Sequence, residues 1–278
     1  MNSLFTYIKT HYIDRLQNDI DIRLHGVEEP RVDFIISGTQ KGGTTALDEY
    51  LRNHPEICMA TRKEVHFFDR EKFFIYPKQN YKEYHEYFQT EPGHLIVGET
   101  TPVYMYWYSA PRRIWDYNPK MKFLILLRNP IERAYSHWNM QRERGFEKLP
   151  FLKAIKEEEN RRKDSLPYQN RHFSYLDRGF YTEQINRLRN YFPMEQILLL
   201  KGDDLRVNPE SVLLQICQFL GISKPKQIEK ITIHSREYSD KMDQKTRDQL
   251  SEIYNLEIKQ IEKLTGWDCQ NWLSPNLS

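Results

Sequence analysis

A loop rich in glycine and hydroxyl side chains follows the first strongly apolar segment of the chain. Val32–Ile36 reads as a buried strand, and Ser-Gly-Thr-Gln-Lys-Gly-Gly-Thr-Thr-Ala-Leu follows it directly at residues 37–47. A glycine-rich turn between a strand and a helix presents backbone N–H groups and the positive end of the helix to an anion. The loop therefore predicts a phosphate-binding site, although the same glycines would also suit an ordinary turn.

Five residues of this loop would supply the contacts. Gly42 and Gly43 can adopt positive φ and turn their N–H groups toward the anion. Thr44 and Thr45 would open the following helix, and Lys41 adds a mobile cation. The lysine stands three positions earlier than in the ATPase pattern G-x-x-x-x-G-K-[ST], so the loop is not a standard nucleotide-triphosphate loop.

A second candidate anion site stands at the end of another apolar segment. Lys122–Leu127 reads as a strand covered on both faces, and Arg128 follows it where a magnesium-dependent NTPase would carry an aspartate. Pro130 suits the first turn of a helix that carries Ser136 about two turns along. Because α/β proteins bind ligands at the carboxyl ends of parallel strands, Arg128 and Ser136 are predicted to meet an anion there. Taken alone, Arg128 would fit a structural salt bridge better.

A carboxylate and an imidazole occur two residues apart in Lys-Glu-Val-His-Phe-Phe. In an extended segment Glu64 and His66 would share one face, as candidates for a general base. The neighbouring Phe67 and Phe68 predict that desolvation raises the pKa of Glu64 toward neutrality. The alternative is a surface glutamate paired with Lys63 or Arg62.

The elements that must position these residues alternate along the chain. Short apolar segments are separated by longer helical patterns, which predicts an α/β fold with a mainly parallel central sheet flanked by helices. The expected strands are Val32–Ile36, Ile57–Met59, Leu95–Val97, Lys122–Leu127 and Gln196–Leu200. The expected helices are Thr44–Asn53, Pro130–Arg144, Phe151–Lys163, Tyr181–Tyr191, Pro209–Leu220 and Gln244–Leu264.

Composition narrows the function classes. The chain has 278 residues and a net charge of only +2, which gives no support to a nucleic-acid or membrane-surface binder. Its three cysteines (Cys58, Cys217 and Cys269) are scattered without metal-ligand spacing, so we expect a cytoplasmic protein with no metal site. No apolar run is long enough to span a bilayer, and membrane insertion is not expected.

The two ends of the chain are expected to differ. Residues 1–30 predict an N-terminal amphipathic helix extension, because apolar residues recur every four positions from Leu4 to Ile20. This helix could pack on its own domain, which we favour, on a partner subunit in a homodimer, or on a membrane face. Residues 31–278 would form the main domain. Within it, the charged stretch 142–178 is expected to be an insertion or mobile excursion with a solvated helix face.

Together the two anion motifs resemble the sulfotransferases that use 3′-phosphoadenosine-5′-phosphosulfate (PAPS). The resemblance is greatest to the heparan sulfate sulfotransferase branch and its soluble bacterial relatives, and covers nearly the whole chain from about residue 31. It also includes Lys63–Asp69, Gly98–Pro102, Gly179–Tyr181, Tyr191–Pro193 and Asp204–Pro209. It implies a P-loop-like three-layer α/β fold.

The resemblance also implies roles for individual residues. The segment from Lys41 to Thr45 would hold the 5′-phosphosulfate, and Lys41 would also stabilise charge on the departing oxygen. Arg128 and Ser136 would bind the 3′-phosphate. A basic loop that often covers the nucleotide in this family matches here only in part, and it leaves Arg236 as a further contact.

On the acceptor side, the resemblance places the general base at Glu64. His66 is then the alternative base or the group that orients the acceptor. Several heparan sulfate enzymes carry a lysine after the third strand, whereas this chain has Thr100, which implies different handling of the acceptor. The aromatic run Thr101–Tyr108 would pack in the core or form a stacking wall for a sugar ring or a flat natural product.

The resulting prediction is a PAPS-dependent sulfotransferase (EC 2.8.2 type). It would move a sulfuryl group to a hydroxyl or amine of a small-molecule natural product by in-line transfer, release 3′,5′-adenosine bisphosphate (PAP), and need no metal. The alternatives are a glycan O- or N-sulfotransferase acting on a simple glycan, a P-loop nucleotide kinase, and a catalytically inactive binding protein.

Overall fold

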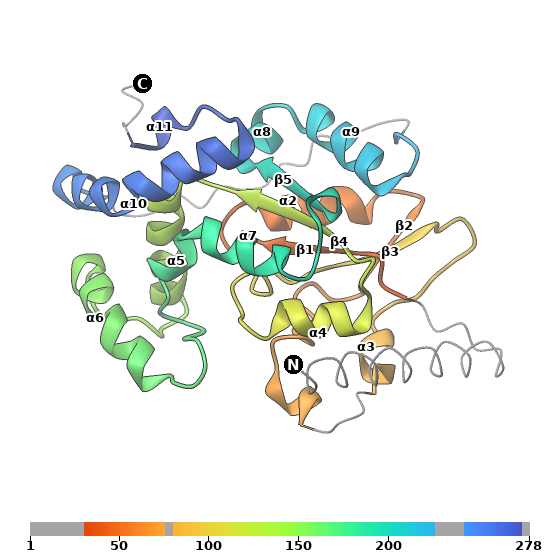
Figure 1. Ribbon diagram of the computed structural model, residues 1–278, viewed down its shortest axis with the longest axis horizontal. Helices are drawn as coiled ribbons and strands as arrows, with labels where there is room; N and C mark the ends of the chain where they lie inside the picture. The colour runs from red at the N-terminus through yellow and green to blue at the C-terminus, as the bar shows by residue number, and fades with distance from the viewer. Residues whose placement is uncertain (1–30, 76–79, 226–241, 274–278) are drawn as a thin grey trace, which may run out of the picture. The chain divides into compact units, whose positions relative to one another are not determined.

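A parallel sheet forms the centre of the computed structural model, which describes residues 31–75, 80–225 and 242–273. The strands of this sheet lie in the order β2-β3-β1-β4-β5, and every neighbouring pair is parallel (Figure 1). They are β1 (Phe34–Gly38), β2 (Ile57–Met59), β3 (Ile96–Thr100), β4 (Lys122–Leu127) and β5 (Ile197–Lys201). Because all run the same way, their carboxyl ends meet at one edge.

Helices connect the strands. The α-helices are α2 (Thr44–Arg52), α3 (Lys82–His85), α4 (Ala110–Tyr117), α5 (Pro130–Glu143), α6 (Phe151–Asp164), α7 (Tyr181–Arg189), α8 (Gly202–Val207), α9 (Pro209–Leu220), α10 (Gln244–Thr265) and α11 (Gln270–Leu273). Short 3₁₀ turns are η1 (Glu71–Phe74), η2 (Asp177–Gly179) and η3 (Met194–Gln196).

The sheet has a separate hydrophobic core on each face. Phe34 and Ile36 of β1 pack on one face with α2, α8 and α9. Ile35 between them packs on the opposite face with α4, α5, α7 and α10. The same alternation along β4 follows from the period of two in a strand. The predicted three-layer α/β fold with a parallel central sheet is therefore confirmed.

The predicted element boundaries hold closely, and the differences occur where polar residues are buried. β1 extends to Gly38, opposite Ile125 of β4, whereas the apolar pattern ended at Ile36. β3 extends to Thr100, because its polar end is buried between neighbouring strands and does not read as a strand in the sequence. The sequence analysis did not predict α3, α4, α8 and α11.

Part of the charged stretch 142–178 packs on the domain and does not form the predicted excursion, whereas the predicted solvated helix face is present on α6, where Glu159, Arg162 and Lys163 are 53%, 53% and 65% exposed. Glu147 is 4% exposed and pairs with Arg161. Glu158 on α6 is 7% exposed and accepts hydrogen bonds from the N–H groups of Leu176 and Asp177. Buried carboxylates satisfied in this way fix the segment that follows α6.

The predicted N-terminal helix, residues 1–30, and the predicted nucleotide contact Arg236 lie outside the described residues. Contacts divide the chain into Met1–Arg31 and Val32–Ser278, and the elements above belong to the second unit. Within the described ranges, no helix is both long and apolar enough to cross a bilayer.

Candidate active site

The predicted donor loop connects β1 to α2 at the carboxyl edge of the sheet. Gly43 caps α2 with a φ of 107°, in the left-handed region that glycine adopts without strain. The N–H groups of Ala46 and Leu47 both donate to the carbonyl oxygen of Gly43. The N–H groups of Thr44 and Thr45 precede them in the first turn, where a helix offers no acceptor. An anion at this helix start would meet these donors.

Gly42 serves the loop differently from the prediction. Its N–H donates to the carbonyl oxygen of Thr39 at 2.8 Å, and the second positive φ falls at Lys41, at 71°. A Cβ at position 42 would lie 2.6 Å from the carbonyl oxygen of Leu126. Gly42 is therefore required for close packing against β4, and its N–H is used inside the loop.

The two predicted anion motifs meet in the structure. β1 and β4 are neighbours, and the guanidinium Nη1 of Arg128 donates to the carbonyl oxygen of Lys41 at 3.1 Å. Arg128 leads directly into α5, whose start is fixed by Asn129 capping the N–H of Ile131. Ser136, on the same helix, is 1% exposed. A long-range contact thus brings the ends of the two strands to one place.

Buried cations lie near His137 of α5, and Lys41 of the donor loop is one of the positive charges that act on it. Burial lowers the pKa of His137 well below its ordinary value, and the positive charges of Arg178, Arg133 and Lys41 lower it further. Arg133 is completely buried, and its Nε and Nη1 atoms have no hydrogen-bond partner. A concentration of positive charge of this kind favours a multiply charged anion nearby.

Arg178 is a buried cation beside the donor loop that the sequence analysis did not single out. It is 3% exposed and donates from Nη1 to Oε1 of Gln40, the residue before Lys41, at 2.6 Å. The Nε atom of Arg178 donates to the hydroxyl of Ser174 at 2.8 Å. The sequence carried a signal here, since Arg178 directly precedes the segment Gly179–Tyr181 that entered the family resemblance.

The predicted base lies in a loop that is bent rather than extended. Glu64 and His66 have φ values of 60° and 58°, in the left-handed region, which costs a non-glycine residue about 1–2 kcal/mol. Even so, the loop brings their side chains together: His66 Nε2 lies 3.5 Å from Glu64 Oε2. Lys63 donates to Glu64 Oε1 at 3.0 Å, so the alternative pairing exists as well.

The predicted raised pKa of Glu64 was wrong. The hydrogen bond from His66 lowers the pKa of Glu64 to about 2, although burial acts in the opposite direction. Phe67 and Phe68, which were expected to dominate, pack in the core around Tyr84. Glu64 is therefore ionised at neutral pH.

His66 is held between two carboxylates. Its Nδ1 lies 3.0 Å from Oδ2 of the buried Asp69. Burial lowers the pKa of His66, but the hydrogen bonds with Asp69 and Glu64 outweigh it and raise the pKa to about 9. Arg171 pairs with the same Asp69, and Arg178 donates to the carbonyl oxygen of Arg171 at 2.9 Å. Polar contacts therefore connect the loop that carries Glu64 and His66, here called the base loop, with the donor loop between β1 and α2.

The aromatic run after β3 is mostly core. Tyr104, Tyr106 and Trp107 are 1%, 4% and 4% exposed, which leaves Tyr108, at 59%, as the exposed aromatic side chain of the run. The hydroxyl of Thr100, where the resemblance expected lysine, is buried and has no hydrogen-bond partner.

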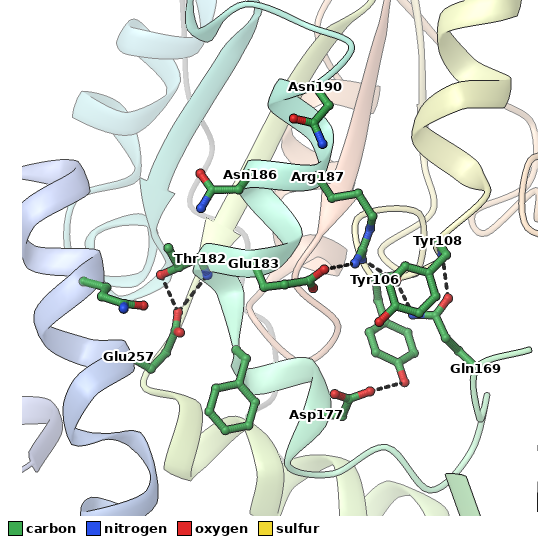
Figure 2. A pocket seen from close by; sticks show the side chains of 12 residues that line it. Tyr106, Tyr108, Gln169, Asp177, Thr182, Glu183, Asn186, Arg187, Asn190 and Glu257 are labelled. Carbon is green, nitrogen blue, oxygen red and sulfur yellow. Dashed lines mark hydrogen bonds and ion pairs between the residues drawn. The ribbon is translucent and has the colours of Figure 1, made fainter. Parts of the chain in front are cut away.

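A pocket of about 820 Å³ lies beside this run. Figure 2 shows Arg187 and Glu183 of α7, paired with each other, extending toward Tyr106 and Tyr108. The lining contains none of the predicted donor or base residues. In the described part of the chain, no three His, Cys, Asp or Glu side chains form a group that could hold a metal.

A sulfotransferase-domain family model matches residues 31–271. The chain belongs to the sulfotransferase family. The matched range contains both anion motifs, the base loop and Arg178, so the family covers every part of the site described above.

Individual sulfotransferases agree with this assignment. The chain is similar to human heparan sulfate glucosamine 3-O-sulfotransferase 5, with 30% identity over 217 residues, which cover 72% of this chain and 56% of that protein. A membrane-associated sulfotransferase, kil1, from Dictyostelium discoideum is 25% identical over 265 residues, covering 68% of this chain and 56% of kil1. The chain thus spans about half the length of the curated relatives it matches.

A solved sulfotransferase matches more completely. The crystal structure of a sulfotransferase from Alicyclobacillus acidocaldarius superimposes with a TM-score of 0.75 and 28% identity, over 87% of this chain and 98% of that one. The arrangement of sheet and helices is therefore a sulfotransferase arrangement.

Proposed function

We propose that this sulfotransferase uses PAPS as its donor and releases PAP, without a metal. The observation that carries the proposal is the contact between Arg128 and Lys41, because it joins the two predicted anion motifs at adjacent strand ends. A donor with phosphates at both ends of one nucleoside needs two such motifs close together. A nucleotide kinase would instead need a carboxylate for magnesium at the end of β4, where Arg128 stands.

The residues of the site fit this donor. We assign the 5′-phosphosulfate to the start of α2, with Lys41, Gly43, Thr44 and Thr45, and the close packing of Gly42 shapes the loop around it. We assign the 3′-phosphate to Arg128 with Ser136. Arg236 is proposed as a further contact. The unpartnered, buried hydroxyl of Thr39 and the nearby buried cations support a ligand rich in anionic oxygens.

Glu64 is the proposed general base. The donor supplies an activated sulfuryl group when bound, and an S–O or S–N bond forms to the acceptor as the bond to the phosphate oxygen breaks. The carboxylate of Glu64 takes the acceptor's proton, and His66 keeps that carboxylate ionised and oriented. Lys41 supplies positive charge for the departing oxygen.

For the acceptor we propose a small-molecule natural product carrying a hydroxyl or amine. The net charge of +2 supports this over a long sulfated polysaccharide, which would favour an extended basic groove. A simple glycan is the second candidate, because the curated relatives include heparan sulfate glucosamine 3-O-sulfotransferases. We place the reaction in the cytoplasm, a reducing compartment that suits the buried, free cysteines Cys58, Cys217 and Cys269.

Isothermal titration calorimetry tests the donor. PAP should bind in the presence of EDTA, and ATP with magnesium should not compete with it. Tight, magnesium-dependent ATP binding without PAP binding would overturn the proposal in favour of a kinase. Incubation with PAPS and a panel of alcohols, amines and oligosaccharides, read by mass spectrometry for an added sulfo group, separates the two acceptor classes.

A further inference from the structure

The loop that carries Glu64 and His66 is held by hydrogen bonds from one short segment of the chain. The N–H of Glu64 donates to the carbonyl oxygen of Thr100 at 2.8 Å. The N–H of His66 makes a long contact of 3.5 Å to the hydroxyl of Thr101, and the N–H of Phe67 donates to the hydroxyl of Tyr104 at 2.8 Å. A loop with two left-handed non-glycine residues persists only when its surroundings fix it in this way.

The hydroxyl of Thr101 is in turn hydrogen-bonded to a buried carboxylate. Glu99, at the end of β3, is 0% exposed. The hydroxyl of Tyr84 donates to its Oε1 at 2.6 Å, and the hydroxyl of Thr101 donates to its Oε2 at 2.7 Å. These hydrogen bonds of Glu99 are made with Tyr84 and Thr101 and not with Glu64 or His66. Any effect of Glu99 on those two residues would therefore be transmitted through its hydrogen-bond partners.

The chemistry of a carboxylate sets the direction of these hydrogen bonds. An ionised carboxylate only accepts, so a hydroxyl beside it must point its single proton inward. The lone pairs of the Thr101 oxygen then face outward and can accept the N–H of His66. A neutral amide at position 99 would offer one accepting oxygen and a donating NH₂ group, and it could not orient both hydroxyls.

We propose that Glu99 is a positioning residue that holds the loop of Glu64 and His66 in its left-handed geometry through the hydroxyl of Thr101. The inference rests on the proposed function only in naming Glu64 as the base. The positions of the Glu64 and Asp69 carboxylates relative to His66 can be tested without an acceptor.

The charges around Glu99 are consistent with this role. Burial raises the pKa of Glu99 to about 7, against hydrogen bonds from Tyr84, Thr101 and Tyr104 that lower it, and the negative charge of Asp69 raises it further. The carboxylate form, which directs both hydroxyls inward, therefore predominates above neutral pH.

The test uses the imidazole of His66 as a reporter of loop geometry. NMR titration of the full chain should place the pKa of His66 near 9 in the wild type. In Glu99→Gln the loop relaxes away from Glu64 and Asp69, and this pKa should fall toward 6.5. Thr101→Val should produce the same fall, whereas Thr101→Ser, which keeps the hydroxyl, should retain the wild-type value.

Glu257→Gln is the matched control. Glu257 is also a buried carboxylate, 5% exposed, that accepts a hydroxyl and an N–H, both from Thr182, but it lies on α10 away from the base loop. An unchanged His66 titration in Glu99→Gln and Thr101→Val would overturn the proposal, and so would an equal shift in Glu257→Gln. Should Glu99→Gln fail to fold, the comparison of Thr101→Val with Thr101→Ser decides.

Kinetics and donor binding separate this inference from the proposed function. Once an acceptor is known, Glu99→Gln should lower kcat about 10- to 100-fold, the order expected for a misplaced catalytic group. Its Kd for PAP should stay within about twofold, because the loop between β1 and α2 is untouched. Absence of PAP binding in the wild type would contradict the proposed function and leave the His66 titration as a valid test of positioning.

Discussion

The guanidinium of Arg178 donates a 2.6 Å hydrogen bond to Oε1 of Gln40, across 138 residues of sequence. Gln40 directly precedes Lys41, and Arg178 also binds the carbonyl oxygen of Arg171, which pairs with Asp69 beside His66. One buried side chain thus ties the donor loop to the residues that surround the base. A change in the position of the donor loop should therefore affect the residues around Glu64 and His66, and the reverse.

The Arg178–Gln40 contact should contribute to donor affinity. We expect Gln40→Ala to weaken PAP binding about tenfold, or about 1.4 kcal/mol, since hydrogen bonds to charged groups contribute about 1.5–3 kcal/mol and part of this is regained from water. A double-mutant cycle with Arg178→Met, measured by calorimetry, should give a coupling of about 1 kcal/mol or more. If the effects of the two substitutions on PAP affinity were strictly additive, the Arg178–Gln40 contact would not contribute to donor binding.

Arg128 should act mainly on binding. Replacing it with alanine removes the proposed charge-assisted contact to the 3′-phosphate and the hydrogen bond to the Lys41 carbonyl, so the free energy of PAP binding should become less favourable by about 1.5–3 kcal/mol. Arg112, 51% exposed on α4, provides a matched control whose alanine variant should bind normally. Unaltered affinity in Arg128→Ala would remove Arg128 from the donor site.

Gly42→Ala should reduce both stability and donor binding. The added Cβ would lie 2.6 Å and 2.9 Å from two main-chain carbonyl oxygens, which cannot move as a side chain does. Overpacking of this kind typically costs about 1–3 kcal/mol, seen as a lower urea midpoint. Gly145→Ala, at a positive φ with open space around it, should also lose stability yet bind PAP normally. Equal PAP affinity in both variants would contradict a shaping role for Gly42.

The pairing of His66 should make stability depend on pH above neutrality. Its pKa is raised to about 9 from an ordinary 6.5, so the stabilisation is fully present below pH 6.5 and is lost as pH rises through 9. The free energy of unfolding of the wild type should therefore fall relative to His66→Asn between pH 7 and 9.5. Urea titrations at several pH values measure this difference.

The window starts at pH 7 because the raised pKa values of Glu99 and Glu158, both about 7, make stability fall with rising pH below that value, in the same direction as the pairing of His66. For Glu64, whose pKa is lowered to about 2, the stabilisation is present above pH 4.5 and is lost as pH falls through 2. A pH-independent difference between wild type and His66→Asn from pH 7 to 9.5 would show that His66 is not charged in the folded state.

Local patterns in the sequence were enough to find the strand ends and the residues beside them. Lys41 and Arg128 could be predicted because a glycine-rich loop or a lone arginine after an apolar strand restricts the chemistry at that point. The parallel sheet followed from the alternation of apolar segments with helices. These features are determined by residues within a few positions of one another, because hydrophobic periodicity and turn preferences are properties of short segments.

The tertiary structure alone decided how these residues work together. Arg178 contacts Gln40 across 138 residues of sequence and Glu99 contacts Tyr84 across 15, and no local pattern identifies either partner. The pKa of Glu64 was misjudged for the same reason: its value depends on the distance to His66, which a left-handed turn sets, and not on the apolar residues next to it in sequence. Electrostatic interactions depend on separation in space and on burial, and both are fixed only when the chain has folded.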